Sequence, residues 1–207
     1  MTQETEWPFR YDGIVESVAS TRQPDTTWNI AALGVYPGKN EICATTWDRT
    51  RTRRNLEASG KCFIQVTSDP VVFARAALET WTRSKPVLPE AAAWVEAEAN
   101  RIDSGFDGET EWVEWSLTPE FATINERQVP IPTRGRAAVI EMTVAASRLG
   151  NDAFEDEPLR DRLDYFAGVA EKCGGEAERR AVERIMDILT TNESIERKPG
   201  CEGGEGA

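Results

Sequence analysis

The sequence contains no histidine among its 207 residues, and its four cysteines are widely spaced, with no CxxC pair. Without imidazole, the Ser-His-Asp and Cys-His nucleophile arrangements and most zinc-site patterns are excluded. We therefore predict no metal site, and we assign no catalytic residue. The cysteines (Cys43, Cys62, Cys173 and Cys201) are interpreted as small buried apolar residues or free surface thiols.

Long apolar runs are also missing from the chain. No run of about 18 apolar residues occurs, so we expect no transmembrane helix and no membrane partner. The first six residues lack the basic and apolar regions of a signal peptide. These two absences predict a cytoplasmic protein.

Lysine is scarce, with 5 residues against 19 arginines, and the net charge is −12. Such an acidic chain is a poor match for a non-specific nucleic-acid binder, so no nucleic-acid partner is expected. The acidic residues are spread along the whole chain, and salt screening weakens the repulsion between them. We interpret this surface as a halophilic adaptation to a salt-rich cytoplasm.

The first part of the chain reads mainly as short strands joined by turns. Strands are expected at 11–20, 28–35, 41–48, 61–67, 111–117, 119–125 and 137–148. Pro37 and Gly38 mark the turn of a hairpin between the second and third strands. In the strand at 111–117, alternation places Val113, Trp115 and Leu117 inward.

Helical segments are inserted between these strands. Thr50–Ser59 is predicted as a helix stopped by Gly60, and Asp69-Pro70 starts a second helix that extends to Thr82. An alanine-rich helix is predicted at Glu90–Arg101. A rigid loop is expected at 130–135, and two helices at 158–172 and 176–191 form a C-terminal hairpin.

We therefore predict a mainly β fold with α-helices, a split β-barrel with inserted helices and a C-terminal helical hairpin. The expected domains are a barrel at 1–150, the hairpin at 151–192 and a disordered acidic tail at 193–207. A doubly wound sheet fits less well, because the early turns are too short for crossovers. No GxGxxG or GxxxxGK[ST] loop occurs.

Four arginines interleaved with threonines lie between 49 and 54, where a strand gives way to a helix. Arginine forks, hydroxyls and the N–H groups of a first helical turn are donors that a phosphate needs. The alternative is a solvated basic face that pairs with the abundant carboxylates. We expect Arg49 and Arg51 to be the ligands, and Arg53 and Arg54 to pair with the acidic surface.

Other polar or small residues lie near strand ends. Asn29, Gln65 and Thr67 have amide or hydroxyl groups that suit a planar polar ligand, and Gly34 permits close backbone approach or a bulge. Taken singly, each is also an ordinary strand residue.

Three segments together resemble an archaeal family of uncharacterised proteins, domain of unknown function 447. They are Trp28–Val35, Asp48–Leu56 and Phe63–Phe73, which match the family patterns N-x-A-P-x-G-V, S-x-T-x-x-N-L and V-N-x-T-x-D-P-x-x-F. Later segments at 138–141 and 146–149 look like the strand end of the family. The family is similar to the FMN-binding split β-barrel superfamily of flavin reductases and pyridoxamine-phosphate oxidases.

The resemblance implies a homodimer with FMN at or near the subunit interface. It implies that a strand at Asn29–Gly34 lies beside the flavin ring, that the 49–55 segment holds the phosphate and ribityl chain, and that the next strand lines the cofactor. Carried over by position, the cofactor-binding residues are Asn29, Ala31, Ala32, Gly34, Arg49, Thr50, Arg51, Thr52, Asn55, Gln65, Thr67 and Ser68.

Three positions depart from the family pattern: Leu33 replaces proline, Thr50 replaces serine and Gln65 replaces asparagine. The expected function is a flavin-dependent oxidoreductase of unknown substrate and unknown electron donor, similar to the flavin reductases. The alternatives are a non-enzymatic module that binds flavin, haem or a pyridoxal-type cofactor, and a structural dimer with an unoccupied groove.

Overall fold

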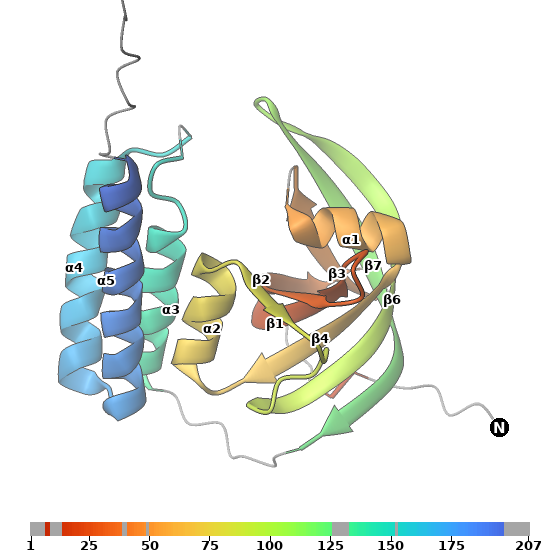
Figure 1. Cartoon of the computed structure of the whole chain (residues 1–207), viewed down its shortest axis with the longest axis horizontal. Helices are drawn as coiled ribbons and strands as arrows, with labels where there is room; N and C mark the ends of the chain where they lie inside the picture. The colour runs from red at the N-terminus through yellow and green to blue at the C-terminus, as the bar shows by residue number, and fades with distance from the viewer. Residues whose placement is uncertain are drawn as a thin grey trace, which may run out of the picture. The chain divides into compact units, whose positions relative to one another are not determined.

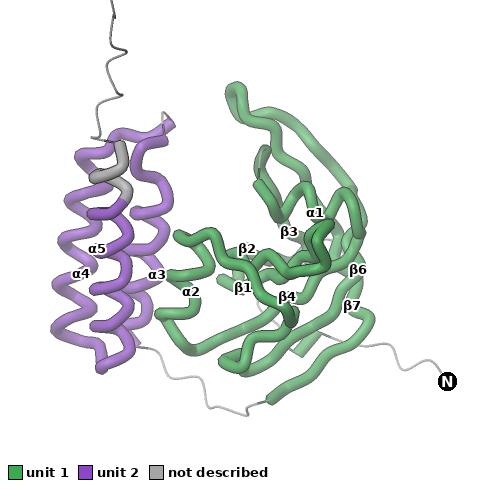
Figure 2. The backbone as a smooth tube through the Cα atoms, viewed as in Figure 1, with its two compact units in different colours: residues 1–132 green, residues 133–207 purple. Residues whose placement is uncertain are grey.

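The computed structural model describes residues 7–8, 14–38, 41–48, 50–125, 133–151 and 153–196, with side chains as far as residue 191. The chain divides into two compact units, Met1–Pro132 and Thr133–Ala207 (Figure 2). The division falls earlier than the expected boundary at residue 150, because a segment that we assigned to the barrel is a helix of the second unit. Most of the expected tail at 193–207 lies outside the described residues, and residues 193–196 continue the last helix.

Within the described residues, the first unit contains seven strands (Figure 1). They are β1 (Val15–Arg22), β2 (Trp28–Pro37), β3 (Ile42–Trp47), β4 (Lys61–Thr67), β5 (Trp81–Arg83), β6 (Ala91–Asp107) and β7 (Thr110–Ile124). Six of them follow the antiparallel order β1-β4-β6-β7-β3-β2, and pairing of β2 with β1 closes the ring. Strand β5 extends the sheet beside β2. The predicted barrel and its β2–β3 hairpin are confirmed.

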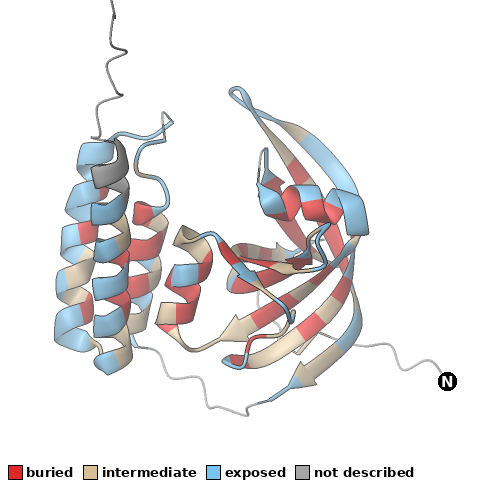
Figure 3. Cartoon of the chain, viewed as in Figure 1, coloured by how far each residue is buried: buried red, intermediate tan, exposed pale blue. Residues whose placement is uncertain are grey.

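Buried residues recur along the strands of the barrel, as the colours of Figure 3 show, and their side chains fill its interior. Val113, Trp115 and Leu117 of β7 are buried in one hydrophobic cluster, as their alternation predicts. Trp7, which precedes the first strand, is partly buried against the same cluster. The barrel is therefore a packed core and not a channel.

Helix α1 (Arg51–Ser59) begins and ends where the sequence predicts. Thr50 is its N-cap, and the Thr50 Oγ1 accepts the N–H of Arg53 at 3.2 Å. Gly60 ends the helix with φ of 63°, a conformation that favours glycine. Leu56 belongs to the barrel cluster, so α1 lies against strands β1, β2 and β3.

Helix α2 (Pro70–Leu78) begins as predicted, with Asp69 Oδ1 accepting the N–H of Val71 at 2.8 Å. The predicted extension to Thr82 is wrong, because Glu79 is already extended and Trp81 starts strand β5. Pairing of β5 with β2 supplies main-chain hydrogen bonds that the sequence pattern does not reveal.

The alanine-rich helix predicted at Glu90–Arg101 is wrong, because this segment forms the first part of strand β6. Alanine has the highest helix propensity, but helix propensity is a weak preference that tertiary pairing overrides. Strands β4 and β7 pair with the two edges of β6. Val95, Ala97 and Ala99 are buried at a spacing of two, the period of a strand.

Two strands predicted at 111–117 and 119–125 form the single long strand β7. Its partner β6 continues beyond the barrel ladder with β4 as far as Asp107, so β6 and β7 form a long hairpin (Figure 1). Register shifts at Glu96/Ala97 and Arg101/Asp103 interrupt the pairing of these strands. Such irregularities bend a strand and let a long hairpin follow the curved barrel.

The second unit contains helices α3 (Arg134–Ala146), α4 (Asp156–Cys173) and α5 (Glu176–Glu196). Helices α4 and α5 form the predicted hairpin, but the strand predicted at 137–148 is wrong. In α3, Ala138, Val139 and Met142 are buried at helical spacing, while Ile140 and Val144 are only partly buried. The predicted loop at 130–135 lies outside the described residues up to 132, and its end forms the start of α3.

No helix in the described part of the chain is both long and apolar enough to cross a membrane.

Candidate functional site

Among the strands that the structure describes, β2 has no partner along part of one edge. One edge pairs with β1 from Trp28 to Val35. The other edge pairs with β5 at 28–30 and with β3 at 35–37, so among the described strands residues 31–34 have no partner on that side. We call residues 31–34 the open edge of β2. Beyond Ala44, strand β3 pairs only with β7, which means that β2 and β3 diverge at this point.

The four predicted ring-binding residues of β2 lie on opposite faces of the strand. Ala31 lies opposite Ala19 of the core cluster, so Asn29 and Ala31 face the barrel interior. Ala32 and Gly34 face outward. The four side chains therefore do not lie on one surface. A ligand at the open edge of β2 could contact the main chain of these residues, but not all four side chains.

Helix α1 begins directly after strand β3, which borders the open edge of β2. The Thr50 hydroxyl donates to the Trp47 carbonyl oxygen at 3.0 Å and fixes the turn between β3 and α1. Arg51 is exposed, and among the described residues it has no ion-pair or hydrogen-bond partner for its side chain. The positive end of the helix and the Arg51 guanidinium together form a donor group suited to an anion. Arg49 lies outside the described residues.

Buried amides join α1 to the barrel. Asn29 Nδ2 of β2 donates to Thr52 Oγ1 at 3.4 Å. Asn55 Nδ2 donates to Thr21 Oγ1 of β1 at 3.0 Å. All four side chains are buried, so three residues that were predicted to contact the cofactor also hold α1 against β1 and β2. The structure brings these three residues together and points their side chains into the fold, and their contact with a cofactor stays a prediction.

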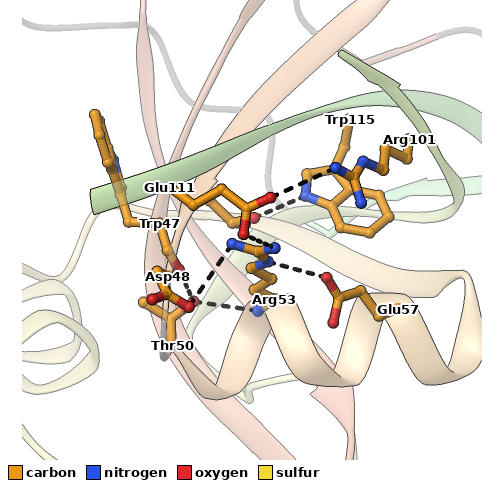
Figure 4. A network of polar contacts seen from close by, with 9 residues as sticks. Trp47, Asp48, Thr50, Arg53, Glu57, Arg101, Glu111 and Trp115 are labelled. Carbon is orange, nitrogen blue, oxygen red and sulfur yellow. Dashed lines mark hydrogen bonds and ion pairs between the residues drawn. The ribbon is translucent and has the colours of Figure 1, made fainter. Parts of the chain in front are cut away.

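Arg53 is surrounded by carboxylates (Figure 4). Its Nη2 lies 2.7 Å from Glu111 Oε2, and its Nε lies 2.9 Å from Glu57 Oε1. Its Nη1 lies 3.9 Å from Asp48 Oδ1. Hydrogen bonds to Glu111 and Glu57 raise the pKa of the Arg53 guanidinium above its ordinary value. Arg53 therefore pairs with acidic groups, as the alternative interpretation of the arginine cluster predicts.

The three predicted residues of the next strand differ in their surroundings. Gln65 is completely buried, and its Oε1 accepts the N–H of Leu88 at 2.7 Å while its Nε2 donates to Ser20 Oγ at 2.7 Å. The structure thus gives the Gln65 side chain a role in anchoring the 84–90 segment, and does not present it to a ligand. Thr67 Oγ1 donates to the Glu90 carbonyl oxygen at 2.9 Å. Ser68 is half-buried.

A hydroxyl cluster that sequence reasoning missed lies where β2 meets β3. Tyr36 Oη lies 2.6 Å from Thr45 Oγ1 and donates to Glu114 Oε1 at 2.9 Å. Burial raises the pKa of the Tyr36 phenol. Pairing between strands that are distant in sequence brings these three side chains together. The sequence shows only the alternation of inward and outward residues within each strand, so it could not predict this cluster.

No group of three or more cysteine, aspartate or glutamate side chains suited to a metal ion occurs among the described residues. The cysteines that the structure describes are free, and Cys43 and Cys62 are buried. Burial raises the pKa of Cys62 to about 12, so this thiol stays protonated at neutral pH. The described residues at the site thus provide hydrogen-bond donors and positive charge for an anion, and none of the described cysteines is an activated nucleophile.

Comparison with known proteins places these features in a family. The family described as Protein of unknown function (DUF447) matches residues 15–126 with its N-terminal domain and residues 133–187 with its other domain. An FMN-bound DUF447 protein, MM1853 from Methanosarcina mazei, shares 28% identity with a TM-score of 0.74, covering 86% of this chain and 96% of its own.

More distant structures share less of the chain. Flavoredoxin from Methanosarcina acetivorans has 10% identity and a TM-score of 0.42, covering 61% of this chain and 78% of its own. The styrene monooxygenase flavin reductase from Pseudomonas putida S12 has 14% identity and a TM-score of 0.42, covering 58% and 92%. No curated protein matches the sequence.

Proposed function

Because this chain belongs to the family of proteins of unknown function DUF447, we propose that it binds FMN, as its relative from Methanosarcina mazei does. One observation on this chain carries the proposal. The open edge of β2 lies beside the point where β2 and β3 diverge, and α1 begins after β3 with Arg51, whose side chain has no partner among the described residues. A planar ring with a phosphate at one end needs these two features close together.

The residues fit the two ends of FMN in different ways. The Arg51 guanidinium and the N–H groups of the first turn of α1 would hold the phosphate. The main chain of the open edge of β2 would offer donors and acceptors to the ring. A Cβ at Gly34 would lie 2.9 Å from Ile14 Cγ2, so glycine at this position leaves room for the Ile14 side chain. Asn29 and Asn55 would act by holding α1 in place.

A flavin-dependent oxidoreductase is the proposed activity. FMN supplies the electron-transfer chemistry when it is bound, and the protein then needs to bind, orient and shield it. That division of labour matches a chain without histidine and without an activated thiol among its described cysteines. We further propose that the protein is a cytoplasmic homodimer with FMN at or near the subunit interface. Analytical ultracentrifugation would test the oligomeric state.

The binding experiment compares two exposed arginines of the same helix. Arg51 and Arg54 are both exposed without a described side-chain partner, and Arg54 lies one turn further along. We expect Arg51→Ala to weaken FMN binding by about 1–3 kcal/mol, because a charge-assisted hydrogen bond to phosphate is lost. Arg54→Ala is the matched control and should leave the affinity unchanged. Failure of the purified protein to carry or take up FMN refutes the proposal.

Enzymatic and non-enzymatic roles are separated by turnover. Steady oxidation of NADH or NADPH by the FMN-loaded protein, beyond the rate of free FMN, supports an oxidoreductase of the flavin reductase type. Tight FMN binding with no turnover favours the module that stores or senses flavin.

A further inference from the structure

Arg53 lies in the first turn of α1, and carboxylates hold two of its three guanidinium nitrogens. Its main-chain N–H is held by the Thr50 cap, and its Nη2 and Nε are held by Glu111 and Glu57. The residue is 8% exposed. Its two hydrogen-bonded guanidinium nitrogens are therefore committed to carboxylates and not to a ligand.

We propose that Arg53 is a positioning residue for the ligand phosphate, which sets the preference for a phosphorylated flavin over an unphosphorylated one by neutralising the carboxylates around α1. The inference rests on the proposed FMN binding. Arg53 would influence this preference without touching the ligand. A change of Arg53 should therefore alter binding of the phosphate and not binding of the flavin ring.

Local charge is the first part of the argument. The cluster contains three carboxylates, Asp48, Glu57 and Glu111, and two arginines, Arg53 and Arg101. Removing Arg53 leaves Arg101, at 3.6 Å from Glu111, as the remaining described cation of this cluster. The surroundings of the first turn of α1 would then be more negative by one charge, which opposes a phosphate dianion and leaves a neutral ligand unaffected.

Helix placement is the second part. Glu111 belongs to β7 and Arg53 to α1, so their ion pair joins the first turn of the helix to the long β6–β7 hairpin (Figure 4). Arg101 of β6 contacts the other oxygen of the same carboxylate. Because Arg53 also bonds the Thr50 cap through its main chain, one residue links the start of α1 to the barrel wall.

Burial distinguishes this pair from the surface ion pairs of the chain. The Arg53 side chain is 10% exposed, whereas the Lys61 side chain in its pair with Glu120 is 52% exposed. Solvent and salt screen exposed pairs and weaken them, whereas a buried pair is screened much less. The Arg53 side chain is shielded, but its partners Glu111 and Glu57 are 30% and 42% exposed, so salt should weaken the influence of Arg53 on a nearby anion without abolishing it.

The experiment measures the affinities of FMN and riboflavin for the full chain, by quenching of flavin fluorescence. We expect Arg53→Gln to weaken FMN binding about tenfold and to change riboflavin binding less than about twofold. Adding Glu111→Gln to that variant removes one of the carboxylates that Arg53 had neutralised and should restore part of the FMN affinity. Thermal melting checks that each variant is folded.

A second variant keeps the inference falsifiable if Arg53→Gln does not fold. Glu57 is 42% exposed by its side chain, so Glu57→Gln is compatible with folding. This variant removes a negative charge and should tighten FMN binding about twofold to threefold without affecting riboflavin. Glu98→Gln, at an exposed strand position of β6, is the control that should change neither affinity.

Two results overturn the inference while leaving the proposed function intact. One is equal weakening of FMN and riboflavin by Arg53→Gln, which indicates a structural role alone. The other is unchanged FMN affinity in folded Arg53→Gln and Glu57→Gln variants. A wild-type protein that binds neither flavin overturns both the proposed function and this inference.

Discussion

Gln65 Oε1 accepts the main-chain N–H of Leu88 at 2.7 Å, and this hydrogen bond fastens the 84–90 segment to the outer face of β4. The Gln65 Nε2 donates to Ser20 Oγ and, at 3.1 Å, to the Pro86 carbonyl oxygen. One buried amide thus connects two barrel strands to a segment that approaches them from elsewhere in the chain. Gln65 lies at a position that the family resemblance assigns to the cofactor, but its amide hydrogen-bonds to other parts of the barrel domain.

We expect Gln65→Leu to lower the free energy of unfolding by about 1–3 kcal/mol, because the Leu88 N–H and the Pro86 carbonyl lose a buried partner. Urea denaturation followed by tryptophan fluorescence measures the change. Ser20→Ala removes one hydroxyl from the same network and should have a smaller effect. A stable Gln65→Leu protein that has lost FMN affinity would instead place this side chain on the ligand.

Two glycines of the second unit provide a matched pair of substitutions. A Cβ at Gly135 of α3 would lie 2.5 Å from the Gly174 Cα, whereas a Cβ at Gly168 of α4 would meet nothing within 4 Å. We expect Gly135→Ala to destabilise the protein by about 1–3 kcal/mol through overpacking against main chain. Gly168→Ala should stabilise it by about 0.5–1 kcal/mol, because alanine loses less conformational entropy in a helix. Thermal melts of both variants test the pair, and a destabilised Gly168→Ala protein would contradict the packing.

The cysteines should react in the order of their exposure. Cys43 and Cys62 are buried, and burial raises the pKa of both thiols, whereas Cys173 is exposed at the end of α4. We expect a maleimide at neutral pH to modify Cys173 in the native protein and to leave Cys43 and Cys62 unmodified until urea is added. Peptide mapping by mass spectrometry assigns the labelled sites. Native labelling of Cys62 as fast as Cys173 would show that the barrel opens readily.

Salt should stabilise the native protein. The net charge of −12 is carried with only 5 lysines, and self-repulsion of such a chain weakens as ionic strength rises. We expect the midpoint of thermal unfolding to rise between low and molar KCl. A midpoint that stays constant or falls would refute the halophilic interpretation of the acidic surface.

Local signals predicted those elements whose ends are determined by neighbouring residues. Thr50 and Gly60 bound α1, and Asp69 with Pro70 starts α2, because capping involves residues a few positions apart. The segment at 91–101 has the composition of a helix, and only its pairing with β4 and β7 makes it a strand. The apolar residues of the segment at 137–148 fit both the period of a strand and the period of a helix. The segment forms a helix in which Ala138 and Met142 are buried four positions apart.

The sequence indicated which segments form the candidate site, but not the directions in which their side chains point. The family resemblance assigned Asn29, Thr52 and Asn55 to one cofactor site, and the structure joins Asn29 to Thr52 directly. The resemblance gave no sign that these side chains face inward, because the face of a strand residue depends on register with distant strands. Glu111 was missed as the partner of Arg53 for the same reason: the two residues are far apart in sequence and meet only after β7 pairs with β3.

The closure of the barrel has a consequence for synthesis on the ribosome. Strand β1 pairs with β2 on one edge and with β4 on the other, and β3 finds its main partner only in β7. A nascent chain that has released β1, β2 and β3 therefore exposes unpaired strand edges until the β6–β7 hairpin emerges. Exposed edges are templates for pairing with other chains, so truncated products ending before β7 should aggregate and should be the species that chaperones retain.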